Sequence, residues 1–210
     1  MPKLGMGPIR REQICRAAAV VIAREGLAGL TMRMVAEEAG VSTGMINHYF
    51  ANRQDLLAKA LLYVSERMQA RVRAALDGLP PGRERLHALL DSALAEEEEV
   101  IETWRVWVNA YGEAVRLPGL RHTIEERLQS WYELIDLAVE GLAPPERGAR
   151  IPVSWRVDAV LNGLAIQWLT SEAALDRRLI RDEVIRTVGL KEPGATVSRR
   201  RGRRPATVTR

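Results

Sequence analysis

The stretch that most constrains the fold is TMRMVAEEAGVSTGMINHYFANR, residues 31–53. Thr31 is a good N-cap residue, and the apolar residues after it recur at helical spacing, which predicts a short amphipathic helix. Gly40 can take the left-handed conformation that ends a helix, and Ser42 can cap a second helix over residues 43–49. Two short helices joined by a tight turn form the helix-turn-helix arrangement, in which the second helix enters the major groove of DNA.

The side chains expected on the exposed face of the second helix suit contacts with bases. They are polar or adaptable, whereas a purely structural helix would more often carry Lys and Glu; they are Thr43, Met45, Asn47 and His48. An Asn side chain can bridge adenine, and a Thr hydroxyl can serve several bases. Gly44 costs about 1 kcal/mol relative to Ala in a helix, and a close approach of its backbone to DNA would explain its presence. The alternative is an ordinary helical hairpin.

Residues 8–60 resemble the DNA-binding domain of the TetR family of bacterial transcriptional regulators. The residues that carry the resemblance are Gly26-Leu27, Thr31, Val35-Ala36, Ala39-Gly40-Val41-Ser42, His48-Tyr49-Phe50, Asn52-Arg53 and Leu56-Leu57. Within the family, the opening MPKLGMGPIRR and the segment VSTGMINHYF resemble the choline-responsive repressors of betaine synthesis, which are called BetI-like. The chain departs from the usual pattern at Arg53, where Lys is common, but Arg can also reach a phosphate.

The resemblance implies which residues contact DNA. It assigns base reading to Arg33, Thr43, Gly44, Met45 and Asn47. It assigns phosphate contacts to Thr31, Ser42, His48, Tyr49 and Arg53. It also implies a ligand-responsive regulator, expected to be a repressor, that binds double-stranded palindromic operator DNA as a homodimer and is released by a small-molecule inducer.

Length and composition narrow the class of protein. A chain of 210 residues can form one large or two small domains with a substantial core. The single cysteine, Cys15, excludes an internal disulfide and a Cys-based metal site. No apolar run approaches the roughly 20 residues of a membrane span, and the N-terminus lacks the apolar region of a signal peptide, so we expect a cytoplasmic protein with no membrane partner.

Charge is distributed unevenly along the chain. Residues 1–77 carry 11 Lys and Arg against 7 Asp and Glu, residues 78–190 carry 13 against 19, and residues 191–210 carry 7 against 1. A basic N-terminal part suits phosphate binding, and an acidic middle part attracts cations or stays off the DNA. The last segment has no apolar face to bury, so we expect a disordered basic tail.

Apolar periodicity predicts an all-α fold. Beyond the two short helices, further helices are expected over residues 9–25, 53–77, 83–116, 119–141, 153–171 and 176–188. The expected organisation is an N-terminal arm and three-helix helix-turn-helix domain over 1–52, a connecting helix over 53–77, a helical ligand-binding and dimerisation domain over 78–190, and a tail over 191–210. Because the connecting helix begins in one domain and ends in the other, it is a plausible lever between them.

Two segments, residues 1–8 and 96–99, each allow two structural interpretations, and a third, residues 153–171, is expected to contact a second copy of the chain. Residues 1–8, with two Pro and two Gly, are expected to lack a regular element; this basic arm either lies along DNA or is a disordered leader. The four glutamates at 96–99 either form a solvated turn or turn at least one carboxylate into a cavity. The segment 153–171 is nearly uncharged and must be buried on most sides. The TetR resemblance implies that residues 153–188 pair with a second copy in a four-helix bundle.

Aromatic residues beyond position 100 suggest a ligand pocket. The candidates are Trp104, Trp107, Tyr111 and Trp131. Aromatic faces attract quaternary ammonium ions, by about 2 kcal/mol or more for a desolvated contact. We therefore expect the inducer to be choline or another organic cation, a polyamine included. The alternative for each ring is ordinary core packing.

Enzymatic chemistry finds little support in the sequence. The three histidines, His48, His87 and His122, have no catalytic or metal-ligating neighbour at useful spacing, and no phosphate loop or dinucleotide fingerprint is present. We therefore expect no catalytic residue, no cofactor and no metal site. The rival to a regulator is a small-molecule binding or sequestering protein whose helix-turn-helix is only structural, and the basic N-terminal part argues against it.

Overall fold

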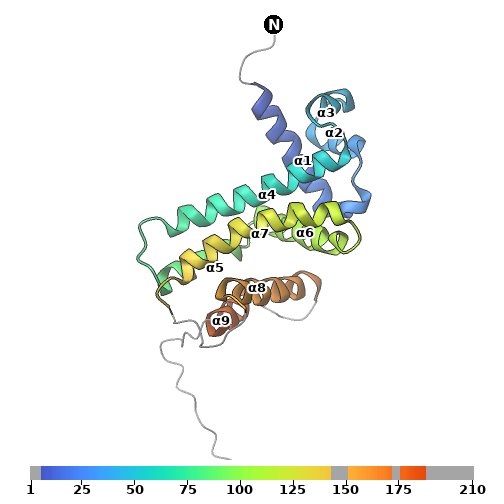
Figure 1. The fold of residues 1–210 in the computed structure, drawn as a ribbon. Helices are drawn as coiled ribbons and strands as arrows, with labels where there is room; N and C mark the ends of the chain where they lie inside the picture. Colours follow the sequence, from blue (N-terminus) through green and yellow to red (C-terminus); the bar gives the residue numbers. More distant parts are fainter. Residues whose placement is uncertain (1–5, 143–150, 172–175, 188–210) are drawn as a thin grey trace, which may run out of the picture.

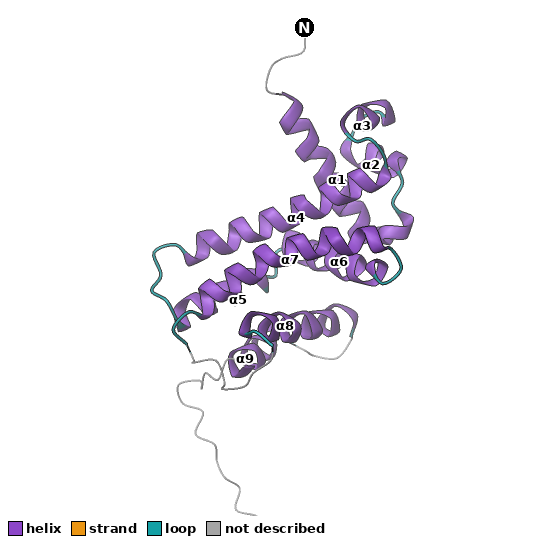
Figure 2. Cartoon of the chain, in the orientation of Figure 1, coloured by secondary structure: helices purple, strands orange, loops and turns teal. Residues whose placement is uncertain are grey.

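The computed structural model describes residues 6–142, 151–171 and 176–187, and every regular element in these ranges is an α-helix (Figures 1 and 2). The helices are α1 Met6–Gly29, α2 Met32–Ala39, α3 Thr43–Tyr49, α4 Arg53–Leu76, α5 Arg83–Ala93, α6 Glu98–Ala114, α7 Pro118–Val139, α8 Val153–Thr170 and α9 Arg177–Thr187. The predicted all-α fold is confirmed. None of these helices is long and apolar enough to cross a membrane. The expected tail over 191–210 lies outside the described residues.

The predicted caps of the helix-turn-helix are confirmed. The Thr31 hydroxyl accepts a hydrogen bond from the Met34 amide at 3.2 Å, and the Ser42 hydroxyl accepts one from the Met45 amide at 3.2 Å. Between the two helices, Gly40 has a φ of 65° and closes the end of α2. The caps at Thr31 and Ser42 and the left-handed conformation of Gly40 therefore make α2 and α3 separate helices joined by a tight turn.

A reciprocal cap begins α4, with Asn52 as its N-cap residue. Asn52 Oδ1 accepts a hydrogen bond from the Asp55 amide at 2.9 Å, and Asp55 Oδ2 accepts one from the Ala51 amide at 3.0 Å. The helix then runs unbroken to Leu76, one residue before the predicted end. Its first turns therefore belong to the helix-turn-helix, and its later turns lie outside it.

The first helix differs from the prediction at both ends. It begins at Met6, although Gly7 and Pro8 were expected to exclude a regular element, because the first turn of a helix does not use the N–H that Pro lacks. The expected irregular arm is therefore wrong for residues 6–8. At Gly26, where the sequence predicts the end, φ is 76° and the helix kinks before a last turn that reaches Gly29.

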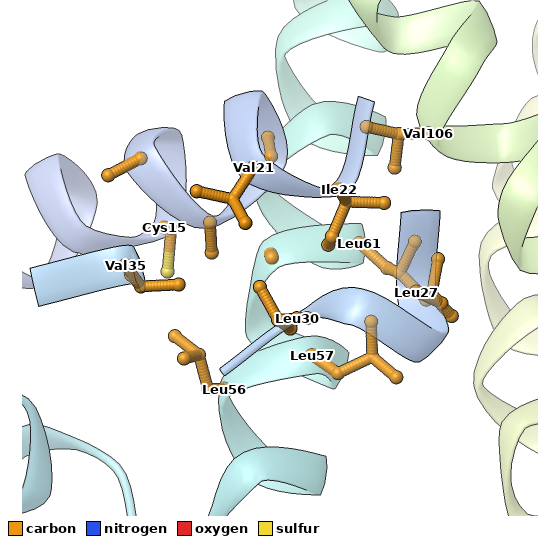
Figure 3. Packing of buried hydrophobic residues seen from close by; sticks show 14 of the residues in the cluster. Cys15, Val21, Ile22, Leu27, Leu30, Val35, Leu56, Leu57, Leu61 and Val106 are labelled. Atoms are coloured by element: carbon orange, nitrogen blue, oxygen red, sulfur yellow. The ribbon is translucent and has the colours of Figure 1, made fainter. Parts of the chain in front are cut away.

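Two hydrophobic cores hold the molecule together. The first lies between α1, α2, α3 and the start of α4, and Val106 of α6 also packs in it (Figure 3). Cys15 is 5% exposed in this core, and burial raises the pKa of its thiol to about 11, as expected for a structural cysteine. The second core lies between the later part of α4 and helices α5 to α9. Helices α4, α6 and α7 contribute to both cores.

The acidic run at 96–99 is exposed: Glu96 and Glu97 lie in the connection between α5 and α6, and Glu98 and Glu99 begin α6. Each of its carboxylates pairs with an arginine: Glu96 with Arg177, Glu97 with Arg71, Glu98 with Arg105 and Glu99 with Arg67. Of the two interpretations of this run, the solvated one agrees with the exposure of all four side chains, but only Glu96 and Glu97 lie outside a helix. The helical pattern predicted over 83–116 is correspondingly split at this connection.

Candidate DNA-binding surface and ligand pocket

Helix α3 presents a polar face at one end of the molecule, far from α8 and α9 (Figure 1). Ile46 is fully buried and anchors the helix in the first core. The other residues of its first turns are exposed: Thr43, Gly44, Met45, Asn47 and His48. The structure therefore brings together, on one accessible surface, all of the base-reading candidates that lie on α3.

Gly44 has no structural reason to be glycine within the protein. A Cβ atom at this position would meet only the Ser42 hydroxyl, at an ordinary contact distance of 3.8 Å. Its φ is not in the left-handed region either. Because nothing inside the chain requires the missing side chain, the reason is expected to lie in a partner that approaches this backbone closely.

The remaining candidates flank α3. Thr31 and Ser42 are exposed, and their hydroxyls already cap α2 and α3. Arg33 is exposed and forms a 3.5 Å ion pair with Glu37 on the same helix. Tyr49 is half-buried, with its ring 5.1 Å from the ring of His48 in an edge-to-face arrangement. Helix N-termini and these donors suit a phosphate backbone.

Arg53 has an additional structural contact that the sequence did not reveal. Its Nε donates a hydrogen bond to the Leu30 carbonyl at 2.8 Å, and its Nη2 donates one to the Leu27 carbonyl. These carbonyls belong to the segment after the kink at Gly26, so Arg53 ties the end of α1 to the start of α4. A phosphate contact through the rest of the guanidinium stays a prediction.

The aromatic candidates line one pocket between α4, α5, α6, α7 and α8. It holds about 490 Å³ of space that protein atoms do not fill, part of it open to solvent. All four predicted rings line it, together with polar and aliphatic side chains. The lining residues are Ser65, Met68, Gln69, Ala93, Thr103, Trp104, Trp107, Tyr111, Arg127, Leu128, Trp131, Asp158 and Asn162. A ring can line the pocket and pack in the core at the same time: Trp104 lines the pocket, is only 8% exposed and belongs to the second core.

Hydrogen bonds hold two of the indole rings in place. Trp104 Nε1 donates to the Ala93 carbonyl at 2.7 Å, and Trp131 Nε1 donates to Asp158 Oδ1 at 2.8 Å. The ring of Trp107 lies 5.8 Å from that of Tyr111, with 37° between their planes. Rings fixed in this way offer their faces to a ligand without a large loss of side-chain entropy on binding.

Sequence reasoning missed Asp158, the acidic residue of this pocket. Its side chain is on α8 and 7% exposed. Burial raises the pKa of its carboxyl to about 6, although hydrogen bonds from Trp131 and Asn162 lower it in part. A signal was present, because Asp158 is the one acidic residue in the nearly uncharged segment 153–171. A buried acid with a strongly shifted pKa in a pocket is a candidate functional group.

Comparison with known proteins finds a match for each of the two regions of the chain. The family profile described as "Bacterial regulatory proteins, tetR family" matches residues 14–60, and the profile described as "BetI-type transcriptional repressor, C-terminal" matches residues 80–188. The HTH-type transcriptional regulator BetI of Vibrio vulnificus strain YJ016 is 35% identical over 158 residues, which are 68% of this chain and 80% of that protein.

Solved structures show the same fold. A transcriptional regulator from Saccharomonospora viridis in complex with choline superposes with a TM-score of 0.71 at 24% identity, over 87% of this chain and 96% of that one. The multidrug binding protein EbrR complexed with ethidium superposes with a TM-score of 0.63 at 28% identity, over 85% of this chain and 98% of that one.

Proposed function

Since the chain belongs to the TetR family of bacterial regulatory proteins and has a BetI-type C-terminal domain, we propose that it is a repressor that an organic cation releases from its operator. That it is a DNA-binding transcriptional regulator, and not an enzyme, follows from the family itself. The observation that carries the DNA part of the proposal is the exposed face of α3 with Gly44 at its start.

On the DNA, α3 lies in the major groove with its N-terminal residues against base edges. Thr43, Met45 and Asn47 then read bases, while the Gly44 backbone makes the close approach that its lack of a side chain permits. Arg33 reaches the groove from α2, where its pairing with Glu37 is exposed and weak. The phosphate contacts come from Thr31, Ser42, His48, Tyr49 and Arg53, which flank α3.

The repressor acts as a homodimer through α8 and α9. The outward face of α8 carries apolar and small side chains at helical spacing: Trp155, Ala159, Gly163 and Ile166. Trp155 is 53% exposed and Ile166 is 37% exposed, and Leu179 of α9 is 49% exposed. Covering these side chains with their symmetry mates would bury apolar surface and place the two α3 helices for two half-sites of a palindrome.

The inducer binds in the aromatic pocket. Four ring systems and one buried carboxyl suit a compact organic cation such as choline, or a larger one such as a polyamine. The complex of EbrR with ethidium, itself an organic cation, supports this ligand class. Binding would alter the packing of α6 and α4, which enter both cores, and so change the spacing between the two α3 helices.

Footprinting tests the proposal. Protection of the DNA that flanks the gene should cover a palindrome, and an organic cation should remove the protection. Asn47→Ala should weaken specific binding by roughly 1–3 kcal/mol with little effect on random DNA. A protein that binds the cation but protects no palindrome would be the sequestering protein of the alternative interpretation.

A further inference from the structure

Asp158 is an unusual member of the aromatic pocket because it is the one acidic side chain in the lining. It is 7% exposed, so its carboxylate is largely removed from water. Its Oδ1 accepts a hydrogen bond from Trp131, and Asn162, one helical turn later on α8, also bonds to it. Both of these bonded groups are uncharged side chains.

The groups that face Asp158 from the neighbouring helices do not neutralise it. From α6, Tyr111 is a neutral phenol whose pKa is raised by burial and by Asp158 itself. From α7 come Tyr132, whose pKa is raised for the same two reasons, and Arg127, which pairs with Glu126 at 3.7 Å.

The remaining surrounding helices also leave the carboxyl without a cation. From α4, Gln69 donates a hydrogen bond to Ser65 at 2.9 Å, and neither side chain is charged. From α9, Arg177 and Arg181 form ion pairs with Glu96 and Asp91. The bonds to Asp158 thus come from neutral donors, and a buried carboxylate favours either a proton or a cation beside it.

We propose that Asp158 is the counterion that selects positively charged ligands in this pocket, and that the ligand and a proton compete for its carboxylate. This inference rests on the proposed function, because it concerns the ligand specificity of the same site. The ring faces of Trp104, Trp107 and Tyr111 attract a cation of suitable shape, whereas Asp158 supplies the full negative charge. Trp131 and Asn162 hold the carboxylate in place.

The competition gives ligand binding a defined pH dependence. The pKa of Asp158 is about 6, so the carboxyl is mostly ionised at pH 7 and mostly protonated at pH 5. A quaternary ammonium ion keeps its charge throughout this range and binds the ionised form. Its affinity should therefore fall by about tenfold between pH 7 and pH 5, and binding at pH 6 should release roughly half a proton.

The experiment compares two probes of nearly equal shape by isothermal titration calorimetry. Choline carries a quaternary nitrogen, and 3,3-dimethyl-1-butanol has carbon in its place. Wild type should bind choline at least about tenfold more tightly than the neutral alcohol. Asp158→Asn keeps the size of the side chain and an oxygen for Trp131, so it should lose most of this preference and all of the pH dependence. Titrations at pH 6 in two buffers of different ionisation enthalpy measure the released proton.

Asp136→Asn is the matched control, because it removes the same charge from an exposed position on α7. It should bind both probes as wild type does. Should Asp158→Asn unfold, the pH dependence and proton release of wild type alone decide the matter. The proposal is overturned if wild type binds choline no better than the alcohol, if it fails to bind choline, or if the Asn variant keeps the preference. Operator binding by wild type is measured separately, so a failure here is distinct from failure of the DNA-binding role.

Discussion

Asp158 should also set a pH dependence of stability, independently of any ligand. Its pKa of about 6 in the folded protein lies above the ordinary 3.8, so the folded state holds the proton more tightly than the unfolded state. Its burial therefore destabilises the protein above pH 6, by up to about 3 kcal/mol, and this penalty fades as the pH falls from 6 toward 4. Urea denaturation should show Asp158→Asn to be more stable than wild type at pH 7, with the difference shrinking at pH 5. A less stable Asn variant at pH 7 would contradict this.

Arg53 is expected to matter for folding as well as for DNA. Its hydrogen bonds to the Leu27 and Leu30 carbonyls join the end of α1 to α4, and charged donors to carbonyls contribute about 1.5–3 kcal/mol. Arg53→Ala should lower the free energy of unfolding by that amount, and with it the urea midpoint, and should also reduce the salt slope of DNA binding by about one. Arg33→Ala is the control, because its exposed pair with Glu37 contributes little to stability. An unchanged midpoint for Arg53→Ala would remove its structural role.

At the residue scale, the sequence predicted contacts between residues close together in the chain, such as helix caps, but not contacts between residues far apart in it. The caps at Thr31, Ser42 and Asn52 depend on backbone groups three residues away, so composition and spacing predict them. The pairing of Arg53 with carbonyls more than 20 residues earlier has no such local signal. Asp158 was visible as an isolated charge in an apolar segment, but the direction in which it faces depends on how α8 packs on α7.

Among the helices, α6 connects the two functional regions most directly. Trp104, Trp107 and Tyr111 lie on its pocket side, while Val106 and Ala110 pack in the first core with α1. The sequence suggested α4 as the lever, because α4 starts in the helix-turn-helix and ends beyond it. The apolar positions of α6 were recognised, but a one-dimensional pattern does not show that two faces of the same helix meet different partners.

The kink of α1, which lies against α6, can be tested with two glycines. Gly26 has a φ of 76°, and a Cβ atom there would lie 3.1 Å from Asn109 Oδ1. Gly26→Ala should therefore destabilise the protein by about 1–3 kcal/mol. Gly112 lies in the same helix as Asn109, but a Cβ atom there would meet nothing within 4 Å. Gly112→Ala should leave stability unchanged or raise it by up to about 1 kcal/mol. Thermal and urea denaturation distinguish the two, and equal effects would contradict the strain expected at Gly26.

In the whole molecule, the proposed DNA-reading surface on α3 and the proposed dimer surface on α8 and α9 lie at opposite ends (Figure 1). The sequence predicted helices over both regions, but it could not separate the inward from the outward face of α8. Leu164 and Trp168 are half-buried and pack in the chain's own second core, so a charge at either position would disturb the subunit itself. The exposed Trp155 and Ile166 are the positions that probe a contact with a second copy.

Ile166→Asp should therefore give a folded monomer. Ile166 is 37% exposed, so a single subunit can solvate the new carboxylate, whereas a dimer would bury it without a partner at a cost of several kcal/mol. Loss of the second subunit should weaken binding to the full palindrome by about 100-fold or more, because the two half-sites are no longer bound together. Binding to an isolated half-site should change little. Sedimentation measures the mass, circular dichroism the fold, and fluorescence anisotropy the two affinities.

Leu137→Asp is the control, since Leu137 is 42% exposed on α7 and outside the proposed interface. A stable dimer of Ile166→Asp with full operator affinity would place the interface elsewhere.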